Sequence, residues 1–217
     1  MTDGTSPELS ASRDPHAPGV ISFELDELDR LKIAVARGLP FARRLSAGLA
    51  FRLSTSAQGD AEFVLQAIEF LEGLRTASNL KLASQFKHEP LRPLWHQHFV
   101  APRHIIPNIG LHWGIRNGGK GSRDLDRVIA EVADTHGDKI DRWPGIIAHR
   151  FANGYTHRSQ AGQLTGDWII FAEHQGERYY LDLATHEEAL PRKATRLLTK
   201  LKGSAAAEFP FAFKNSV

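Results

Sequence analysis

Apolar residues recur at intervals of three and four in the first third of the chain, which is the spacing of amphipathic helices. The row from Leu25 to Val35 has Ser22 as a candidate N-cap and Gly38 as a stop. Similar rows follow Pro40 and Asp60, and the last of them continues to about residue 83. Residues 21–88 are therefore predicted to form a lobe of about three helices.

The strongest β pattern lies in the segment GDWIIFAEHQGERYYLDLA. Residues 168–172 and 178–183 are rich in β-branched, aromatic and aliphatic side chains, and Gln175-Gly176 lies between them as a turn. This pattern predicts a β-hairpin over residues 167–184. Because both faces of the hairpin are largely apolar, we expect it to lie inside a sheet that helices cover.

The remaining patterns complete the predicted architecture. Residues 1–20 are rich in Ser, Pro, Asp and Gly without an apolar period and are predicted to be a disordered tail. Four prolines between residues 90 and 107 break any long helix, and an amphipathic helix is predicted at 191–202. The expected fold class is α+β, with the N-terminal helical lobe followed by a small antiparallel sheet packed with helices in a domain over residues 89–217.

The composition narrows the classes of protein that fit. The chain is 41% hydrophobic and 24% charged, which is typical of a globular protein. It has no cysteine, which excludes disulfides and thiol nucleophiles and agrees with a cytoplasmic location. No apolar run has the length of a membrane span, and the N-terminus lacks the order of a signal peptide, so we expect no membrane partner.

Histidines are concentrated in LRPLWHQHFVAPRHIIPNIGLHW, residues 91–113, which contains four of the chain's eleven histidines. On a strand the rings of His96 and His98 would lie on one face and could act on one ligand. On a helix the two rings would diverge by about 200°. The neighbouring prolines leave both conformations open, and His104 and His112 are optional members of such a site.

These histidines favour two kinds of chemistry and one structural role. A His-based metal-dependent hydrolase would use them as ligands, but the chain has neither an HExxH motif nor cysteine, so we expect no metal and no other cofactor. Packing and hydrogen bonding in a core would need no chemistry at all. The third interpretation is acid–base catalysis without a metal.

Cleavage of RNA requires one group that deprotonates the 2′-hydroxyl, one that protonates the leaving oxygen, and a cation that stabilises the charge on phosphorus. Histidine suits the first two roles because its ordinary pKa lies near 6.5, and arginine suits the third. The candidates for proton transfer are His96, His98 and His157. Arg158 and Arg178 are the candidates for contact with phosphate.

The predicted C-terminal helix carries its own pattern. Arg192, Lys193, Arg196 and Lys200 accompany its apolar stripe without an acidic residue inside the helix, so they are the candidate nucleic-acid-binding residues. A solvated helix face would have the same composition. The net charge of +2 is too small to decide between these interpretations.

The sequence therefore supports three hypotheses about function. The first is a phosphodiesterase directed at nucleic acid, and residues 150–188 loosely resemble compact bacterial ribonuclease toxins, without a diagnostic motif. The second is a non-catalytic module that binds nucleic acid or protein through the basic helix. The third is the metal-dependent hydrolase.

Overall fold

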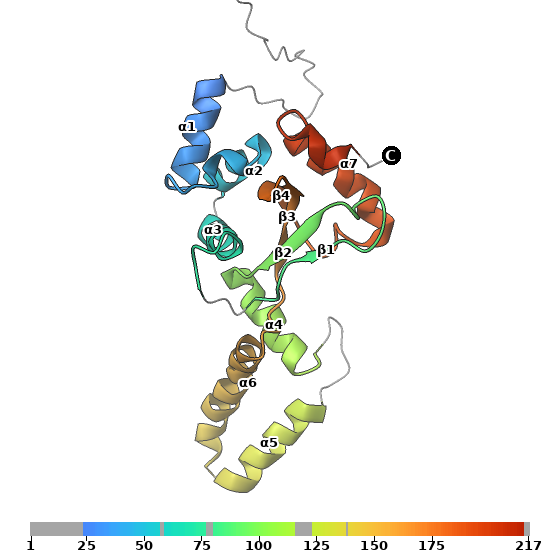
Figure 1. The fold of residues 1–217 in the computed structure, drawn as a ribbon. Helices are drawn as coiled ribbons and strands as arrows, with labels where there is room; N and C mark the ends of the chain where they lie inside the picture. Colours follow the sequence, from blue (N-terminus) through green and yellow to red (C-terminus); the bar gives the residue numbers. More distant parts are fainter. Residues whose placement is uncertain (1–23, 57–58, 77–79, 116–122, 138, 215–217) are drawn as a thin grey trace, which may run out of the picture.

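The computed structural model in Figure 1 contains a small β-sheet between helices, with further helices projecting from one end of the sheet. The structure describes residues 24–56, 59–76, 80–115, 123–137 and 139–214. The predicted tail at 1–20 and the predicted N-cap Ser22 lie outside these ranges.

The sheet confirms the predicted α+β class. It has four antiparallel strands that follow one another in chain order. The strands are β1 (Ser84–Gln85), β2 (Trp95–Phe99), β3 (Asp167–His174) and β4 (Glu177–Ala184). β3 and β4 form a hairpin that spans the range in which the sequence predicts one.

The N-terminal helices cover one face of this sheet. They are α1 (Leu25–Val35), α2 (Ala47–Ser54) and α3 (Asp60–Leu71). Their apolar rows enclose Phe99, Ile169, Phe171 and Tyr180 of the sheet in one continuous buried cluster. The helical lobe and the sheet therefore share a core, and this arrangement agrees with the apolar character of that face of the hairpin.

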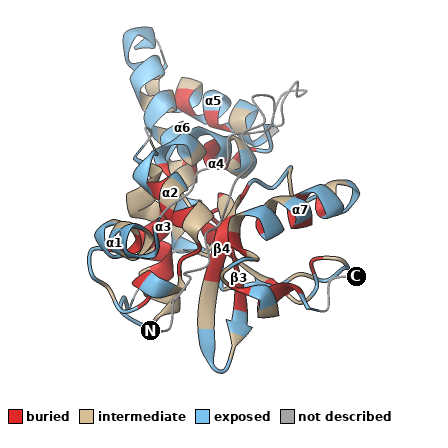
Figure 2. Cartoon of the chain, turned by 90° about the horizontal axis from the view of Figure 1, so that it is seen from above, coloured by how far each residue is buried: buried red, intermediate tan, exposed pale blue. Residues whose placement is uncertain are grey.

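The opposite face of the sheet packs against the C-terminal part of the chain. Helix α7 (Ala194–Ala205) follows a 3₁₀ turn at Pro191–Lys193 and buries Leu197 and Leu201. The last turn, Pro210–Phe213, adds further apolar side chains to the same cluster. Figure 2 shows buried residues concentrated in β3 and β4 between these layers, which is the covering on both faces that the hairpin sequence indicates.

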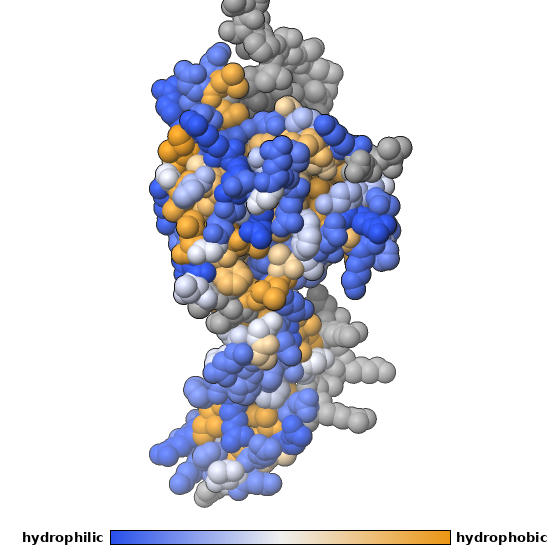
Figure 3. All heavy atoms as spheres, in the orientation of Figure 1, coloured by the Kyte–Doolittle hydropathy of each residue, from blue (hydrophilic) through white to orange (hydrophobic). Residues whose placement is uncertain are grey.

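The segment between β2 and β3 forms a helical arm, defined here as α4, α5 and α6. These helices span Ile105–His112, Arg123–His136 and Trp143–Gln160. Ile109, Trp113, Val128 and Val132 form a separate buried cluster in the arm. Along the arm in Figure 3, apolar side chains emerge between hydrophilic ones. The arm thus has its own small core and joins the sheet where β2 ends and β3 begins.

The free edge of β4 is covered by side chains from both helical layers. Ser46 at the start of α2 donates its backbone N–H to the carbonyl of Tyr180 at 2.9 Å and its hydroxyl to the carbonyl of Leu181 at 2.6 Å. The register shifts between β3 and β4 at this point, and the fully buried Asp182 accepts from Arg52 and Ser204. These bonds pair or cover the middle of the β4 edge, and an uncovered strand edge is a common site of aggregation.

One predicted helix is shorter than its apolar pattern. The row that starts near Asp60 continues to about residue 83, but α3 ends at Leu71. Gly73 has a φ of +71°, and the backbone N–H of Leu74 bonds to the carbonyl of Glu69 at 2.8 Å. A glycine in the left-handed conformation terminates many helices in this way, so the apolar residues beyond it belong to the approach to β1.

Candidate functional site

The conformation of residues 95–99 answers the question raised by the paired histidines. This segment is strand β2, so His96 and His98 lie on the same face of the sheet. Their ring centroids are 6.0 Å apart. Pairing with β3 places His98 directly opposite Trp168. The extended form therefore brings the two rings together on the face that α7 covers.

A third histidine joins this pair from the loop after β4. The ring of His186 lies 5.2 Å from that of His98, and the indole ring of Trp168 lies 4.7 Å from His186 and 4.3 Å from His96. We call His96, His98, His186 and Trp168 the histidine cluster. His98 is only 7% exposed, whereas His186 is exposed, so the cluster reaches from the sheet surface to solvent.

Burial lowers the pKa of all three histidines of the cluster, most strongly on the strand. Burial, assisted by the charge of His186, lowers the pKa of His96 and of His98 to about 4. Burial also lowers the pKa of His186, but the carboxylate of Asp167 opposes that shift. His186 is therefore the member that takes up a proton first, and its charge then adds to the burial that disfavours protonation of the other two rings.

Hydrogen bonds orient two of the rings. His98 Nδ1 faces the carbonyl oxygen of Gly166 at 3.4 Å, which favours the tautomer with the proton on Nδ1 and leaves Nε2 as the basic nitrogen. His96 Nε2 lies 3.2 Å from the hydroxyl of Ser84, and its Nδ1 is buried without a hydrogen-bond partner among the described residues. His98 is thus better placed than His96 to use a basic nitrogen.

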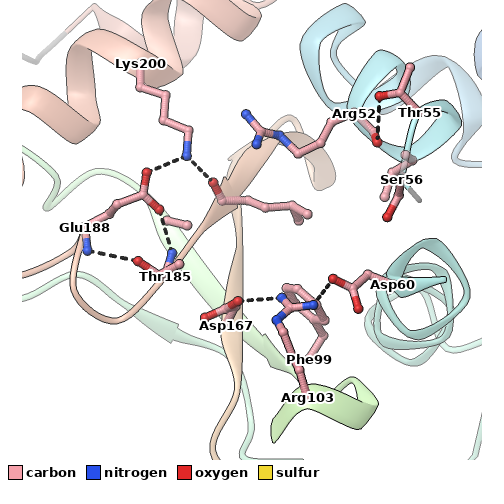
Figure 4. Close-up of a pocket in the computed structure, with 13 residues that line it drawn as sticks. Arg52, Thr55, Ser56, Asp60, Phe99, Arg103, Asp167, Thr185, Glu188 and Lys200 are labelled. Atoms are coloured by element: carbon pink, nitrogen blue, oxygen red, sulfur yellow. Dashed lines mark hydrogen bonds and ion pairs between the residues drawn. The ribbon is translucent and has the colours of Figure 1, made fainter. Parts of the chain in front are cut away.

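A pocket opens at the same end of the sheet, and we call it the sheet-end pocket. Its volume is about 330 Å³. Figure 4 shows Arg52, Arg103 and Lys200 pointing into it from α2, the turn before α4, and α7. Sequence segments that lie far apart in the chain therefore direct three cationic side chains at one hollow.

Each of these cations also meets a carboxylate. Arg103 lies between Asp60 and Asp167, with 2.6 Å to Asp167. Arg52 pairs with Asp182 at 2.8 Å and Lys200 with Glu188 at 2.7 Å. Burial raises the pKa of Asp167, but hydrogen bonds from His104 and Arg103 outweigh it and hold that pKa below its usual value. The pocket is therefore a balanced set of charges and not a purely cationic patch.

The histidine cluster and the sheet-end pocket adjoin each other. Thr185 lines the pocket, and the next residue in the chain is His186. Asp167, another lining residue, also supports the protonated form of His186 through its charge. The pocket and the cluster therefore meet at Thr185 and Asp167, although none of the cluster's own side chains lines the pocket.

His157 and Arg158 lie on α6 and belong to the arm. The ring of His157 is 5.2 Å from that of His112, and Arg158 donates to the side-chain oxygen of Asn108 at 3.2 Å. Asn108 in turn bonds to Thr165, two residues before β3 begins. The structure therefore places His157 away from the histidine cluster and gives Arg158 a role in anchoring the arm to the sheet.

Arg178 lies at the other end of the hairpin. It is paired with Glu173 in the register of β3 and β4, and it donates to the backbone carbonyl of Leu71. Glu173 lies five positions after Trp168 on β3, which corresponds to about 17 Å along the strand. The structure does not bring Arg178 to the cluster.

The four basic residues predicted to bind nucleic acid lie on α7 and the turn before it. Lys193 pairs with Glu187, and Lys200 pairs with Glu188. Arg192 and Arg196 are exposed and form no ion pair with any described residue. The helix itself lacks acidic residues, but the preceding loop supplies two carboxylates to its basic face.

Two further observations bear on the alternatives. In the part of the chain that the structure describes, no three His, Asp or Glu side chains are arranged to hold one metal ion. No described helix combines the length and apolar character needed to cross a bilayer.

Comparisons of the chain with known proteins find no matching family model, no similar characterised protein and no similar solved structure.

The sequence interpretation missed the contribution of His186, Arg103 and Asp167 to one site. The predicted hairpin indicates the position of His186, because this residue comes two positions after the last residue of β4. Arg103 and Asp167 meet only because β2 pairs with β3 across the inserted arm. A pattern within either segment alone does not indicate that pairing.

Proposed function

We propose that the protein is a phosphodiesterase that cleaves RNA, with His98 as the general base and His186 as the general acid. The observation that carries this proposal is the neighbouring pair itself: two imidazoles 5.2 Å apart whose environments separate their pKa values. Such a separation assigns one group to each role in many acid–base enzymes. His96 borders the pair, with its ring centroid 6.0 Å from that of His98.

The proposed reaction is transesterification within the RNA strand. His98 Nε2 removes the proton of a ribose 2′-hydroxyl, and the oxygen attacks the adjacent phosphorus. Protonated His186 donates its proton to the departing 5′-oxygen, so a 2′,3′-cyclic phosphate and a 5′-hydroxyl are formed. The proton balance then requires His98 to lose its proton and His186 to regain one before the next turnover.

The sheet-end pocket supplies the phosphate contacts in this proposal. Arg103 and Lys200 point into the hollow beside Thr185, which precedes His186. A phosphate oxygen there would receive charge-assisted hydrogen bonds, and these are stronger than bonds between neutral groups. The carboxylates that now pair with these cations keep them oriented before substrate binds.

The test is incubation of the purified protein with matched RNA and DNA oligonucleotides, with and without a chelator of divalent metals. The proposal expects cleavage of RNA only, with cyclic phosphate ends, and no loss of rate on chelation. Cleavage of DNA, or a rate that depends on an added metal, would contradict the proposed chemistry. Folding is checked independently by circular dichroism.

The pH dependence of cleavage is a specific prediction. The base must be deprotonated, so the rate is expected to rise as pH increases through about 4. The acid must be protonated, so the rate is expected to fall again as pH increases through the pKa of His186, which burial places below the ordinary histidine value of about 6.5. Initial rates across this range should give a bell-shaped profile with an acidic optimum, and a plateau that persists into alkaline pH would contradict the assignment.

The basic face of α7 favours a second candidate function, which is binding of nucleic acid without catalysis. Arg192 and Arg196 are exposed and form no ion pair within the described ranges, so they are available to phosphates. Salt-dependent binding of RNA without cleavage at any pH in the titration would favour this candidate. A role as a toxin or defence protein would depend on the proposed cleavage of RNA, so it requires that cleavage is observed.

A further inference from the structure

The loop between β4 and α7, residues 185–190, places two carboxylates on the basic face of α7. We call this segment the acidic loop. Glu187 pairs with Lys193, and Glu188 contacts Lys200 at 2.7 Å. Glu188 also accepts from the backbone N–H of Thr185 at 2.8 Å, which orients the Glu188 side chain within the loop. The acidic loop therefore covers cations that the helix would otherwise present to solvent.

A second pocket lies along α7 beyond the sheet-end pocket. Its volume is about 760 Å³, and Lys193, Arg196 and Lys200 line it together with Glu187. These three cations follow one another at spacings of three and four residues, so they lie on one side of the helix about one turn, or 5.4 Å, apart. This is a row of cationic side chains directed at one groove.

The two pockets share a wall. Thr185, Glu188 and Lys200 line both of them. The path from Arg103 past Lys200 to Arg196 therefore continues from the proposed site of cleavage onto α7. A ligand with regularly repeated negative charges would match this path, and the backbone of a nucleic acid is such a ligand.

The contact between Glu187 and Lys193 is that of an exposed ion pair, whereas the pair of Glu188 with Lys200 is partly buried. The side chain of Glu187 is 72% exposed and that of Lys193 is 34% exposed. The hydrogen bond from Lys193 lowers the pKa of Glu187, so this carboxylate is ionised at neutral pH. Exposed pairs contribute little net stability and exchange readily, because water screens both charges. A phosphate group can therefore replace the carboxylate.

We propose that Glu187 and Glu188 occupy the places of two phosphate groups on α7, and that a single-stranded nucleic acid displaces them as it runs from the sheet-end pocket into the second pocket. This inference rests on the proposed function, because it extends the same site. The strand is single because a flexible backbone can pass over a shared wall and turn its bases into pockets on either side, whereas a duplex holds its phosphates on a rigid surface.

The test measures binding of a fluorescently labelled single-stranded DNA oligonucleotide, which lacks the 2′-hydroxyl and so remains intact under the proposed chemistry. Glu187→Gln frees Lys193 while keeping the size of the side chain. We expect the variant to bind about threefold more tightly than the wild type. Its affinity should also fall more steeply with salt, by about one counterion, because one more cation contacts phosphate.

The matched control is Glu131→Gln on α5. Glu131 is also exposed, and it pairs with Arg150 at 2.9 Å, so the variant changes the net charge equally and frees a cation on the arm. This control is expected to bind like the wild type. An equal gain in affinity by both variants would show that the change in net charge alone explains the effect, and it would overturn the inference.

Three other results would also overturn it: unchanged or weaker binding by Glu187→Gln, tighter binding of duplex than of single strand, or no binding of either strand by any variant. Cleavage of RNA is measured separately. If Glu187→Gln strengthens binding but RNA stays intact at every pH, the groove is supported and only the proposed catalysis fails.

Discussion

Replacement of His186 by alanine is expected to lower the rate of RNA cleavage by about 10²- to 10⁴-fold, the usual contribution of a general acid. His186 is the exposed member of the histidine cluster and the one that takes up a proton first. Without it the leaving 5′-oxygen departs unprotonated. The measurement is the initial rate on a fluorophore-labelled RNA oligonucleotide at the acidic optimum.

The pH profile of His186→Ala separates catalysis from a structural effect. Loss of the acid should remove the falling limb of the bell, because that limb reports the deprotonation of His186. Loss of fold would lower the rate at every pH without changing the shape of the profile. His98→Ala should instead remove the rising limb, and the two losses should not add, because the residues act as a unit.

Two exposed histidines outside the cluster provide matched controls. His88→Ala and His149→Ala remove the same side chain from the approach to β2 and from α6. Both variants are expected to retain the wild-type rate. A rate for His186→Ala that lies within about twofold of these controls would remove His186 from the mechanism, since a general acid contributes at least about 10²-fold.

Replacement of Gly166 by alanine is expected to have the largest effect on stability. A Cβ atom built on Gly166 would lie 1.8 Å from the carbonyl oxygen of Phe99 and 3.2 Å from the Cα atom of Val100. These are backbone atoms at the end of β2, so they can move only if the pairing of β2 with β3 opens. We expect a loss of about 3 kcal/mol or more in the free energy of unfolding.

Gly203→Ala is the control for this substitution. Gly203 lies inside α7, and a Cβ atom there meets nothing within 4 Å. Alanine favours the helix over glycine, so this variant should gain about 0.5–1 kcal/mol. Urea denaturation of both variants measures the two changes. If Gly166→Ala unfolds at the same denaturant concentration as the wild type, the close packing of Gly166 on β2 is wrong.

The parts of the fold that depend on local patterns could be predicted. The runs of β-branched, aromatic and aliphatic residues on either side of Gln175-Gly176 predict the hairpin, and the apolar row on 191–202 predicts the helix, because each pattern reports burial of one segment on its own. The termination of α3 was harder. Gly73 ends that helix although apolar residues continue beyond it, and the pattern does not show which of several glycines takes the left-handed conformation.

The candidate site depends on contacts between distant segments, and only part of it could be predicted. The alternation WHQHF correctly limits His96 and His98 to one face if the segment is extended. It does not show that Trp168 lies opposite His98, or that Arg103 reaches Asp167. Those contacts follow from the register between β2 and β3, which tertiary packing sets and neither strand specifies alone.

The inserted arm also bears on how the protein folds. Phe99 and Asp167 are partners across β2 and β3, although the whole of residues 100–166 lies between them in the chain. Closing so long a loop is entropically costly, but each doubling of its length adds only about 0.6 kcal/mol. The arm has a core of its own, so it can form first and bring the two strand ends close together. We therefore expect the β2–β3 pairing, a contact of high contact order, to form late in folding, and the histidine cluster to be assembled with it.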